Sequence, residues 1–318
     1  MKKIIIIVLS FTAFVGYGQQ YALNTQYMFN EAAFNPAAAG AKDYIPVHLN
    51  FRRQWAGFDG APAAQTLTSH ANMGKNLGFG GNLYNESSGP SRSTGINLML
   101  SYRLRLSKDD MHSLRMGLGV SFSQHLIDAN KLTQEVANDP AISNSVNNTM
   151  VPDADFGFYY TYGKKGFAGF SVKNATQMRR SLFDFDQTFT NNMVRHYYFT
   201  GGYNFELNED WMIKASTLFR MIESRPFQVD LNATVEWKKM LWLGASYRHQ
   251  DAIGALVGFQ FGIAKAGYSY DYPLSAIRNA SSGSHEVFME LQIFTKRNGQ
   301  SPSTLWLKRN RIYSTPVF

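Results

Sequence analysis

The chain has 318 residues, no cysteine and a formal net charge of +8. The lack of cysteine excludes disulfides, thiolate metal sites and cysteine nucleophiles. The positive charge is only a weak indication of nucleic-acid binding, because the basic residues are scattered and no nucleic-acid motif accompanies them. Aromatic residues make up 14% of the chain and there are 26 glycines, yet the mean hydropathy is −0.27. Alternating apolar and polar residues would produce this combination.

Residues 1–18 have the organisation of a secretory signal peptide. Lys2 and Lys3 form its basic region, residues 4–14 form its apolar region, and cleavage is predicted near Gly18. The apolar run is too short for a membrane-spanning helix, and no later run reaches the ~18 consecutive apolar residues that such a helix needs. The sequence therefore predicts an exported protein without a membrane-spanning helix.

Residues 227–238 alternate without a break between apolar and polar side chains. Side chains of a β-strand point to opposite faces in turn, so this segment has one apolar and one polar face. The apolar face begins with Phe227 and ends with Trp237, and such rings suit the two interfaces of a bilayer that a tilted strand of this length would cross. For a single segment, a half-buried strand of a soluble sandwich is an equal alternative.

The same alternation recurs along the chain and predicts about fourteen antiparallel strands. Their ranges are 44–57, 62–74, 76–87, 91–107, 110–126, 153–163, 166–174, 194–206, 210–223, 226–238, 240–249, 252–262, 264–273 and 284–297. Connections after even-numbered strands are tight, whereas those after odd-numbered strands include all the long ones, at about 127–152, 175–193 and 274–283. This asymmetry is typical of an outer-membrane β-barrel with both chain termini in the periplasm. We therefore expect an all-β transmembrane antiparallel barrel over residues 44–297, followed by a tail at 298–318.

A barrel of fourteen strands has a lumen too wide for the strand side chains to fill. We expect residues 19–43, with help from the long loops, to plug it, because the aromatic side chains of Tyr21, Tyr27, Phe29 and Phe34 must be buried somewhere. Water could fill the lumen instead. The polar strand faces are predicted to line it with Arg103, Arg105, Lys214, Arg220, Asp230, Glu236 and Lys265, and these charges are compatible with a plug or with a channel.

Three groups of residues form motifs that stand apart from the alternation. The first contains Gln26, Tyr27, Phe29, Asn30, Asn35, Pro36 and Gly40; the second contains Arg53, Gln54, Trp55, Gly57 and Pro62; the third contains Ser282, Gly283, Ser284, His285 and Glu286. Together they resemble the PorP/SprF family of type IX secretion and gliding-motility outer-membrane proteins, over about residues 20–297. The resemblance implies a barrel in the outer membrane that anchors or escorts a secreted surface adhesin through its C-terminal domain. It also implies contact with periplasmic secretion components, and it makes these residues candidates for plug or partner contacts.

Several of these residues have alternative interpretations. Strict alternation would point Arg53 to lipid, so we expect it at the rim or beside a bulge, and Trp55 is more simply an interfacial anchor than a recognition residue. Ser284, His285 and Glu286 do not predict a catalytic triad, because neighbours on a strand face opposite ways and a triad is defined by geometry. The Asn- and Asp-rich segment 138–155 lacks EF-hand spacing, so a solvated loop is preferred to a calcium site.

These observations favour a non-enzymatic interaction protein with no cofactor and no nucleic-acid partner. The alternative is an outer-membrane channel for small solutes. A further expectation concerns the basic turns, which would form a positive rim toward periplasmic partners unless they are simply solvated: Lys164, Lys165, Lys238 and Lys239, with Lys308, Arg309 and Arg311 in the tail.

Overall fold

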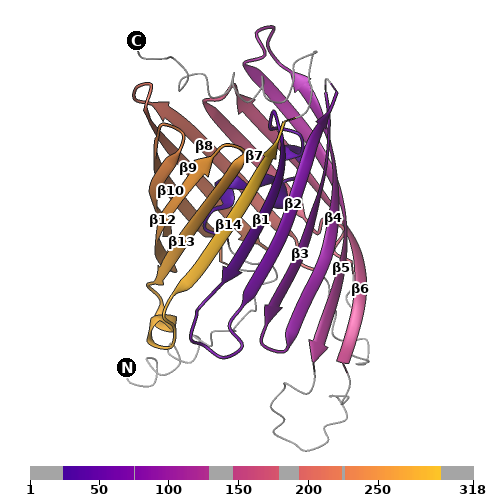
Figure 1. The fold of residues 1–318 in the computed structure, drawn as a ribbon. Helices are drawn as coiled ribbons and strands as arrows, with labels where there is room; N and C mark the ends of the chain where they lie inside the picture. Colours follow the sequence, from indigo (N-terminus) through magenta and orange to yellow (C-terminus); the bar gives the residue numbers. More distant parts are fainter. Residues whose placement is uncertain (1–23, 75, 129–145, 179–192, 224–225, 295–318) are drawn as a thin grey trace, which may run out of the picture.

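The computed structural model describes residues 24–74, 76–128, 146–178, 193–223 and 226–294. They form a closed barrel of fourteen antiparallel strands, in which sequence neighbours pair and the first strand pairs with the last (Figure 1). The predicted barrel is confirmed. No helix among these residues is long and apolar enough to cross a bilayer. The predicted signal peptide, the start of the plug at 19–23, the tail and both termini lie outside the described residues.

The strands are bounded as follows: β1 (Ile45–Arg53), β2 (Ala63–Met73), β3 (Leu77–Ser88), β4 (Ser91–Arg105), β5 (His112–Asp128), β6 (Val146–Tyr162), β7 (Gly166–Lys173), β8 (His196–Glu206), β9 (Trp211–Ile222), β10 (Gln228–Trp237), β11 (Leu241–Arg248), β12 (Ala252–Phe261), β13 (Ala264–Pro273) and β14 (Ser284–Ile293). Short 3-10 turns are η1 (Tyr27–Phe29), η2 (Glu31–Ala33), η3 (Pro36–Ala38) and η5 (Ala276–Asn279).

Three predicted strand boundaries are wrong. The last predicted strand, 284–297, ends at Ile293, and residues 295–297 lie outside the described ranges. The other two are wrong for local reasons. The first strand ends at Arg53 rather than at 57, because Trp55 takes a positive φ of 52° that a strand cannot contain. β6 begins at Val146 rather than at 153, because pairing with β5 continues to Asp128 and carries Asn- and Pro-containing sequence into the strand. The predicted connection 127–152 is shorter for this reason.

The alternation of the sequence becomes the two faces of the barrel wall. On β10, Leu231 and Val235 are exposed on the outer surface, whereas Asp230 and Asn232 are buried on the lumen side. An apolar outer surface around a polar interior is the arrangement that a membrane-spanning barrel requires. Aromatic side chains also pair on the outer surface near its edge, where Trp237 lies opposite Trp211.

The two ends of the barrel differ. The tight-turn end carries the start of β1, the end of β14 and the short connections such as 238–240 and 262–263 (upper end in Figure 1). The long-loop end carries the connections 54–62 and 274–283 (lower end in Figure 1). These two connections bond to each other, because the Ala56 amide donates to the Gly283 carbonyl (2.7 Å) and the Ser282 amide donates to the Ala56 carbonyl (2.8 Å).

Candidate functional site

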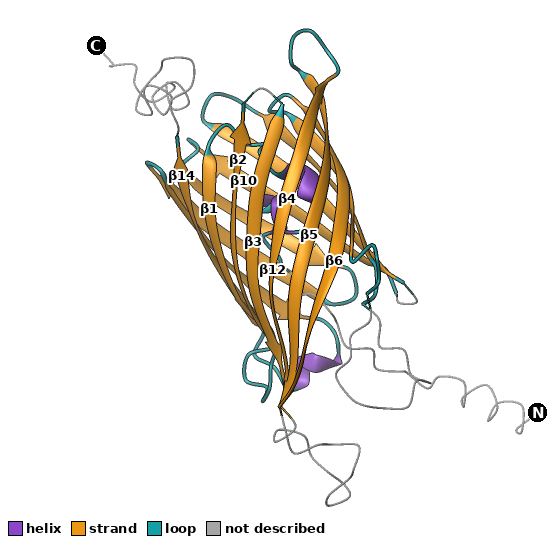
Figure 2. Cartoon of the chain, turned by 90° about the vertical axis from the view of Figure 1, so that its right-hand side faces the viewer, coloured by secondary structure: helices purple, strands orange, loops and turns teal. Residues whose placement is uncertain are grey.

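Residues 24–44, which we call the plug, lie inside the barrel, where their short turns are visible through the wall (Figure 2). Their aromatic side chains are buried as predicted: Tyr27, Phe29 and Phe34 are 2%, 8% and 9% exposed. The plug runs from the long-loop end, where Asn24 lies near Gln228, to the tight-turn end, where it joins β1. The described parts of the connections 54–62 and 274–283 bond to each other at the mouth, so the plug that we observe is the N-terminal segment.

The plug is held near the long-loop end by ion pairs around Thr25. Arg52 of β1 bonds Asp271 (2.7 Å) and Glu286 (2.9 Å), and its guanidinium also donates to the Thr25 hydroxyl (3.0 Å). The Thr25 amide donates to Glu286 (2.7 Å). All four side chains are almost fully buried, so these charges depend on one another, on the plug and on the neighbouring wall residues Asn50 and Arg248.

Two further strands, β10 and β11, contact the same threonine. Arg248 of β11 pairs with Asp230 (3.2 Å) and donates to the Thr25 hydroxyl (3.2 Å). The Asn232 side chain of β10 donates to the Thr25 carbonyl (3.0 Å). The Thr25 hydroxyl also donates to Asp271 of β13, so Thr25 connects β1, β10, β11, β13 and β14 on one side of the barrel wall.

The middle of the plug lies in a recess lined by wall glycines. Asn35 caps η3 by accepting from the Ala37 amide (2.9 Å), and it donates to the Phe158 carbonyl of β6 (3.0 Å). A Cβ atom added to Gly117 would lie 2.2 Å from the Ala37 nitrogen, and one added to Gly78 would lie 2.3 Å from the Ala39 carbonyl oxygen. The plug backbone is therefore in direct contact with the wall, where only glycine leaves room.

Towards the tight-turn end, Gly40 is bonded through both of its backbone groups. Its amide donates to His70 Nδ1 (3.1 Å), and its carbonyl accepts from Arg115 (2.7 Å). Its φ of +69° is a conformation that favours glycine. Lys42 then pairs with Glu290 of β14 (3.2 Å). The predicted motif residues Asn35, Pro36 and Gly40 therefore contact the barrel wall.

An aromatic cluster packs between the plug and the wall on the side of β11 to β14. The Phe29 ring lies 5.4 Å from Trp242 and 4.9 Å from Phe288 between centroids. The ammonium of Lys265 lies 3.9 Å from the centre of the Phe29 ring and 4.8 Å from that of Trp242. A cation over aromatic faces is favourable, particularly away from water, so this predicted lumen charge is held against the plug.

The first and third predicted motifs meet in the lumen. The Gln26 backbone amide donates to the Glu286 carboxylate (3.2 Å). The Asn30 side chain donates to the Thr68 hydroxyl of β2 (2.9 Å). Ser284 and Glu286 are buried on the lumen side, whereas His285 lies on the outer side and bonds the Tyr268 hydroxyl (2.7 Å). This opposite orientation agrees with the argument against a triad.

The second motif lies at the long-loop rim. Arg53 is exposed in the last pair of β1, opposite Ala63 and His285, and the register is unbroken. The rim position is therefore the correct alternative, and the bulge is wrong. The Gln54 amide donates to the Pro62 carbonyl (2.8 Å), the Trp55 amide donates to Ser284 (3.1 Å), and Gly57 has a φ of +92°.

The sequence motifs singled out Arg53, but its neighbour Arg52 holds the plug. Because Phe51 points outward, the alternation indicates that Arg52 points inward. Nothing in the sequence indicated that its partners would be Asp271 on β13 and Glu286 on β14. Arg103 lies on the inner face of β4 as predicted, 16% exposed at the tight-turn end, and pairs with Asp110 (3.1 Å). Arg105 needs correction, because it lies at the rim of the same end, where it also pairs with Asp110 (3.4 Å). Arg105 is 48% exposed there.

The described residues contain no group of three or more His, Cys, Asp or Glu side chains that could hold a metal ion. In the segment considered for calcium, residues 138–145 are outside the described ranges. Asp153 and Asp155 lie on β6 and accept from the Thr176 and Asn174 amides (3.0 Å each). Both carboxylates are therefore bonded to the segment that follows β7.

A closed barrel with an apolar outer surface, unequal connections at its two ends and a lumen filled by its own N-terminal segment is a plugged outer-membrane β-barrel. The chain matches the family model described as "Type IX secretion system membrane protein PorP/SprF" over residues 16–291, and it belongs to this family. No curated protein matches it.

Several solved barrels are similar in shape. A Pseudomonas aeruginosa FadL homologue is 11% identical with a TM-score of 0.48, covering 87% of this chain and 95% of that one. The P. putida toluene transporter TodX is 8% identical with a TM-score of 0.46 (85% and 95% covered). The KdgM porin is 10% identical with a TM-score of 0.39 (77% and 98% covered).

Proposed function

We propose that this protein anchors or escorts a type IX secreted surface protein at its long-loop end and contacts periplasmic secretion components at its tight-turn end. Membership of the PorP/SprF family supports the secretion context. In this proposal the long-loop end faces the outside, as the loop asymmetry of outer-membrane barrels indicates. The barrel acts by binding and has no catalytic role.

The observation that carries the proposal is the plug. Buried ion pairs, a glycine recess and an aromatic cluster hold residues 24–44 along the lumen. Each of these contacts is between described residues of one chain, so the filled lumen needs no partner. A barrel closed in this way is suited to present its ends rather than to pass solutes, which is the alternative function.

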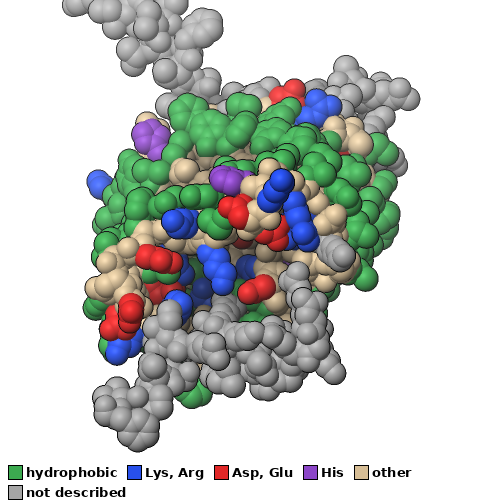
Figure 3. Space-filling view, turned by 90° about the horizontal axis from the view of Figure 1, so that it is seen from above, with side chains coloured by type: hydrophobic (Ala, Val, Ile, Leu, Met, Phe, Trp, Pro, Cys, Tyr) green, Lys and Arg blue, Asp and Glu red, His purple; other side chains and the backbone are tan. Residues whose placement is uncertain are grey.

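The tight-turn end supports docking of a partner with both charge signs. A cavity of ≈ 370 Å³ there is lined by Lys42, Arg103, Arg115 and Lys164 together with Asp43 and Asp110. A second cavity, of ≈ 410 Å³, is lined by Glu206, Glu209, Asp210 and Glu236 with Lys239. Figure 3 shows basic and acidic side chains gathered within the apolar outline of this end. The expected positive rim is therefore of mixed charge, and Lys238 faces Asp210 at 3.9 Å.

The test is a pull-down of the tagged full-length protein from its native outer membrane in a gentle detergent, with every co-purifying chain identified. The proposal predicts a large secreted surface protein retained through its C-terminal domain. A variant with charge reversal at Lys164 and Lys165 should keep this protein and lose periplasmic components. Recovery of the barrel alone, even after crosslinking, would contradict the proposal and favour the channel.

A further inference from the structure

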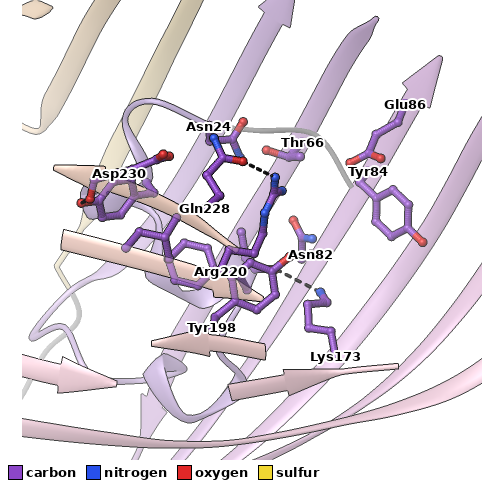
Figure 4. Close-up of a pocket in the computed structure, with 14 residues that line it drawn as sticks. Asn24, Thr66, Asn82, Tyr84, Glu86, Lys173, Tyr198, Arg220, Gln228 and Asp230 are labelled. Carbon is purple, nitrogen blue, oxygen red and sulfur yellow. Dashed lines mark hydrogen bonds between the residues drawn. The ribbon is translucent and has the colours of Figure 1, made fainter. Parts of the chain in front are cut away.

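A small cavity lies between the plug and the wall at the long-loop end of the lumen (Figure 4). Its volume is ≈ 60 Å³. One side is apolar and includes Phe34, Tyr198 and Leu218, which pack together with Tyr27. The opposite side is polar and includes Thr66, Asn82 and Arg220.

Arg220 is a buried guanidinium in this cavity wall, 5% exposed. It donates to the Gln228 side chain (2.7 Å; dashed in Figure 4), which is neutral. Among the described residues no carboxylate forms an ion pair with it. By contrast, the equally buried Arg52 and Arg248 each pair with at least two carboxylates.

The other charges of the cavity have partners of their own. Lys173 pairs with Asp155 (3.5 Å) and donates to the Ala33 carbonyl (3.2 Å). Asp230 pairs with Arg248 (3.2 Å). Glu86 also lines the cavity without an ion pair to Arg220 among the described residues. Arg220 is thus a buried cation of this cavity with no carboxylate at ion-pair distance among the described residues, because Asp230, which pairs with Arg248, attracts it only from further away.

One further polar atom points to a missing ligand. The Thr66 hydroxyl is buried and has no hydrogen-bond partner among the described residues, and Thr66 lines the same cavity. A buried charge or polar group is costly unless it is paired. A guanidinium matches a carboxylate through two parallel hydrogen bonds, and the Thr66 hydroxyl can donate one more.

We propose that this cavity is a binding site for one carboxylate group carried by a polypeptide. A volume of ≈ 60 Å³ admits about two water molecules, which is the size of a carboxylate with one carbon attached, and the apolar side accommodates the hydrocarbon that follows. The carboxylate is a C-terminal carboxylate or an acidic side chain. The secreted partner would supply this carboxylate, and that part of the inference rests on the proposed function. The existence of the site does not rest on it.

The experiment titrates the purified full-length protein in detergent with acetate and with acetamide, measured by calorimetry. Acetate should bind and acetamide should not. Arg220→Gln should weaken acetate binding by about tenfold or more, while Arg103→Gln, at the other end of the barrel, should leave it unchanged.

If Arg220→Gln fails to fold, Thr66→Val keeps the shape and the charge of the cavity and should still weaken acetate binding severalfold. Equal binding of acetate and acetamide, or acetate binding that Arg220→Gln and Thr66→Val leave intact, would overturn the proposal.

Two capped peptides separate the sources of the carboxylate. One has a free C-terminal carboxylate, and the other is amidated and carries a glutamate side chain. Arg220-dependent binding of the first alone assigns a C-terminal carboxylate, and binding of the second assigns an acidic side chain. If neither peptide binds, a polypeptide ligand is excluded and the proposal fails. These results concern the purified barrel, so they are independent of the pull-down.

Discussion

Thr25 is a small residue that receives contacts from five strands of the barrel. The wall side chains that bond Thr25 are Arg52, Asn232, Arg248, Asp271 and Glu286. Such buried ion pairs add little net stability over a well-packed apolar core, but removing one member leaves an uncompensated charge. The cluster therefore specifies where the plug lies more than it stabilises the barrel.

Arg52→Met should release the plug. It leaves Glu286 buried without its counter-ion and leaves Asp271 only the longer pair with Arg248 (3.5 Å), a loss of about 3–5 kcal/mol. Hydrogen exchange of the peptide covering residues 24–44 should then accelerate about a hundredfold or more, because each 1.4 kcal/mol is about a factor of ten.

The neighbouring Arg53→Met is the matched control for this variant. Arg53 is exposed at the rim, so its loss should change the free energy of opening by less than about 0.5 kcal/mol. Similar exchange rates in the two variants would show that the ion pairs do not hold the plug.

At the scale of elements, the wall and the plug fit through glycines. Gly78 on β3, Gly117 on β5 and Gly157 on β6 each leave space that a Cβ atom would take from the plug. Glycine in a strand interior weakens the strand. Its presence therefore marks a close approach of the plug backbone at Gly78 and Gly117, and of the Asn35 side chain at Gly157.

Gly78→Ala should displace the plug, because its Cβ would lie 2.3 Å from a backbone oxygen that cannot rotate away. Overpacking of this kind costs typically about 1–3 kcal/mol, measurable as a lower midpoint of urea unfolding in detergent micelles. Gly81→Ala on the same strand is the control, because its nearest contact would be 3.8 Å. Equal losses in both variants would mean that strand propensity, and not the plug, causes the effect.

The strands of the barrel wall could be predicted from the sequence, whereas most contacts between the plug and the wall could not. Alternation and turn spacing are local, so they predicted fourteen strands and the inward side of Asp230 and Glu236. The start of β6 was missed because pairing with β5 overrides the loop-like composition before Asp153. The Arg52 ion pairs were missed because they depend on closure between β1 and β14, which no local pattern encodes.

At the scale of the whole molecule, the barrel has two chemically different ends and a closed interior. The long-loop end holds the Arg220 cavity and the bonded connections 54–62 and 274–283. The tight-turn end holds two larger cavities with charges of both signs. A protein that works through its ends requires that these ends face opposite compartments.

Orientation can be tested with single cysteines, because the chain has none. Ala280→Cys is exposed in a long connection and Asn208→Cys is exposed in a tight turn. A membrane-impermeant maleimide applied to intact cells should label the first variant and not the second. After lysis it should label both variants. The opposite pattern would invert the assignment of the two ends.

The most direct test of the plugged barrel is single-channel conductance in planar bilayers. The intact protein should show no stable open-barrel steps, and Arg52→Met should show frequent transitions to larger conductance as the plug leaves the lumen. A large and stable conductance of the intact protein would contradict the account, because a lumen filled by residues 24–44 cannot carry it.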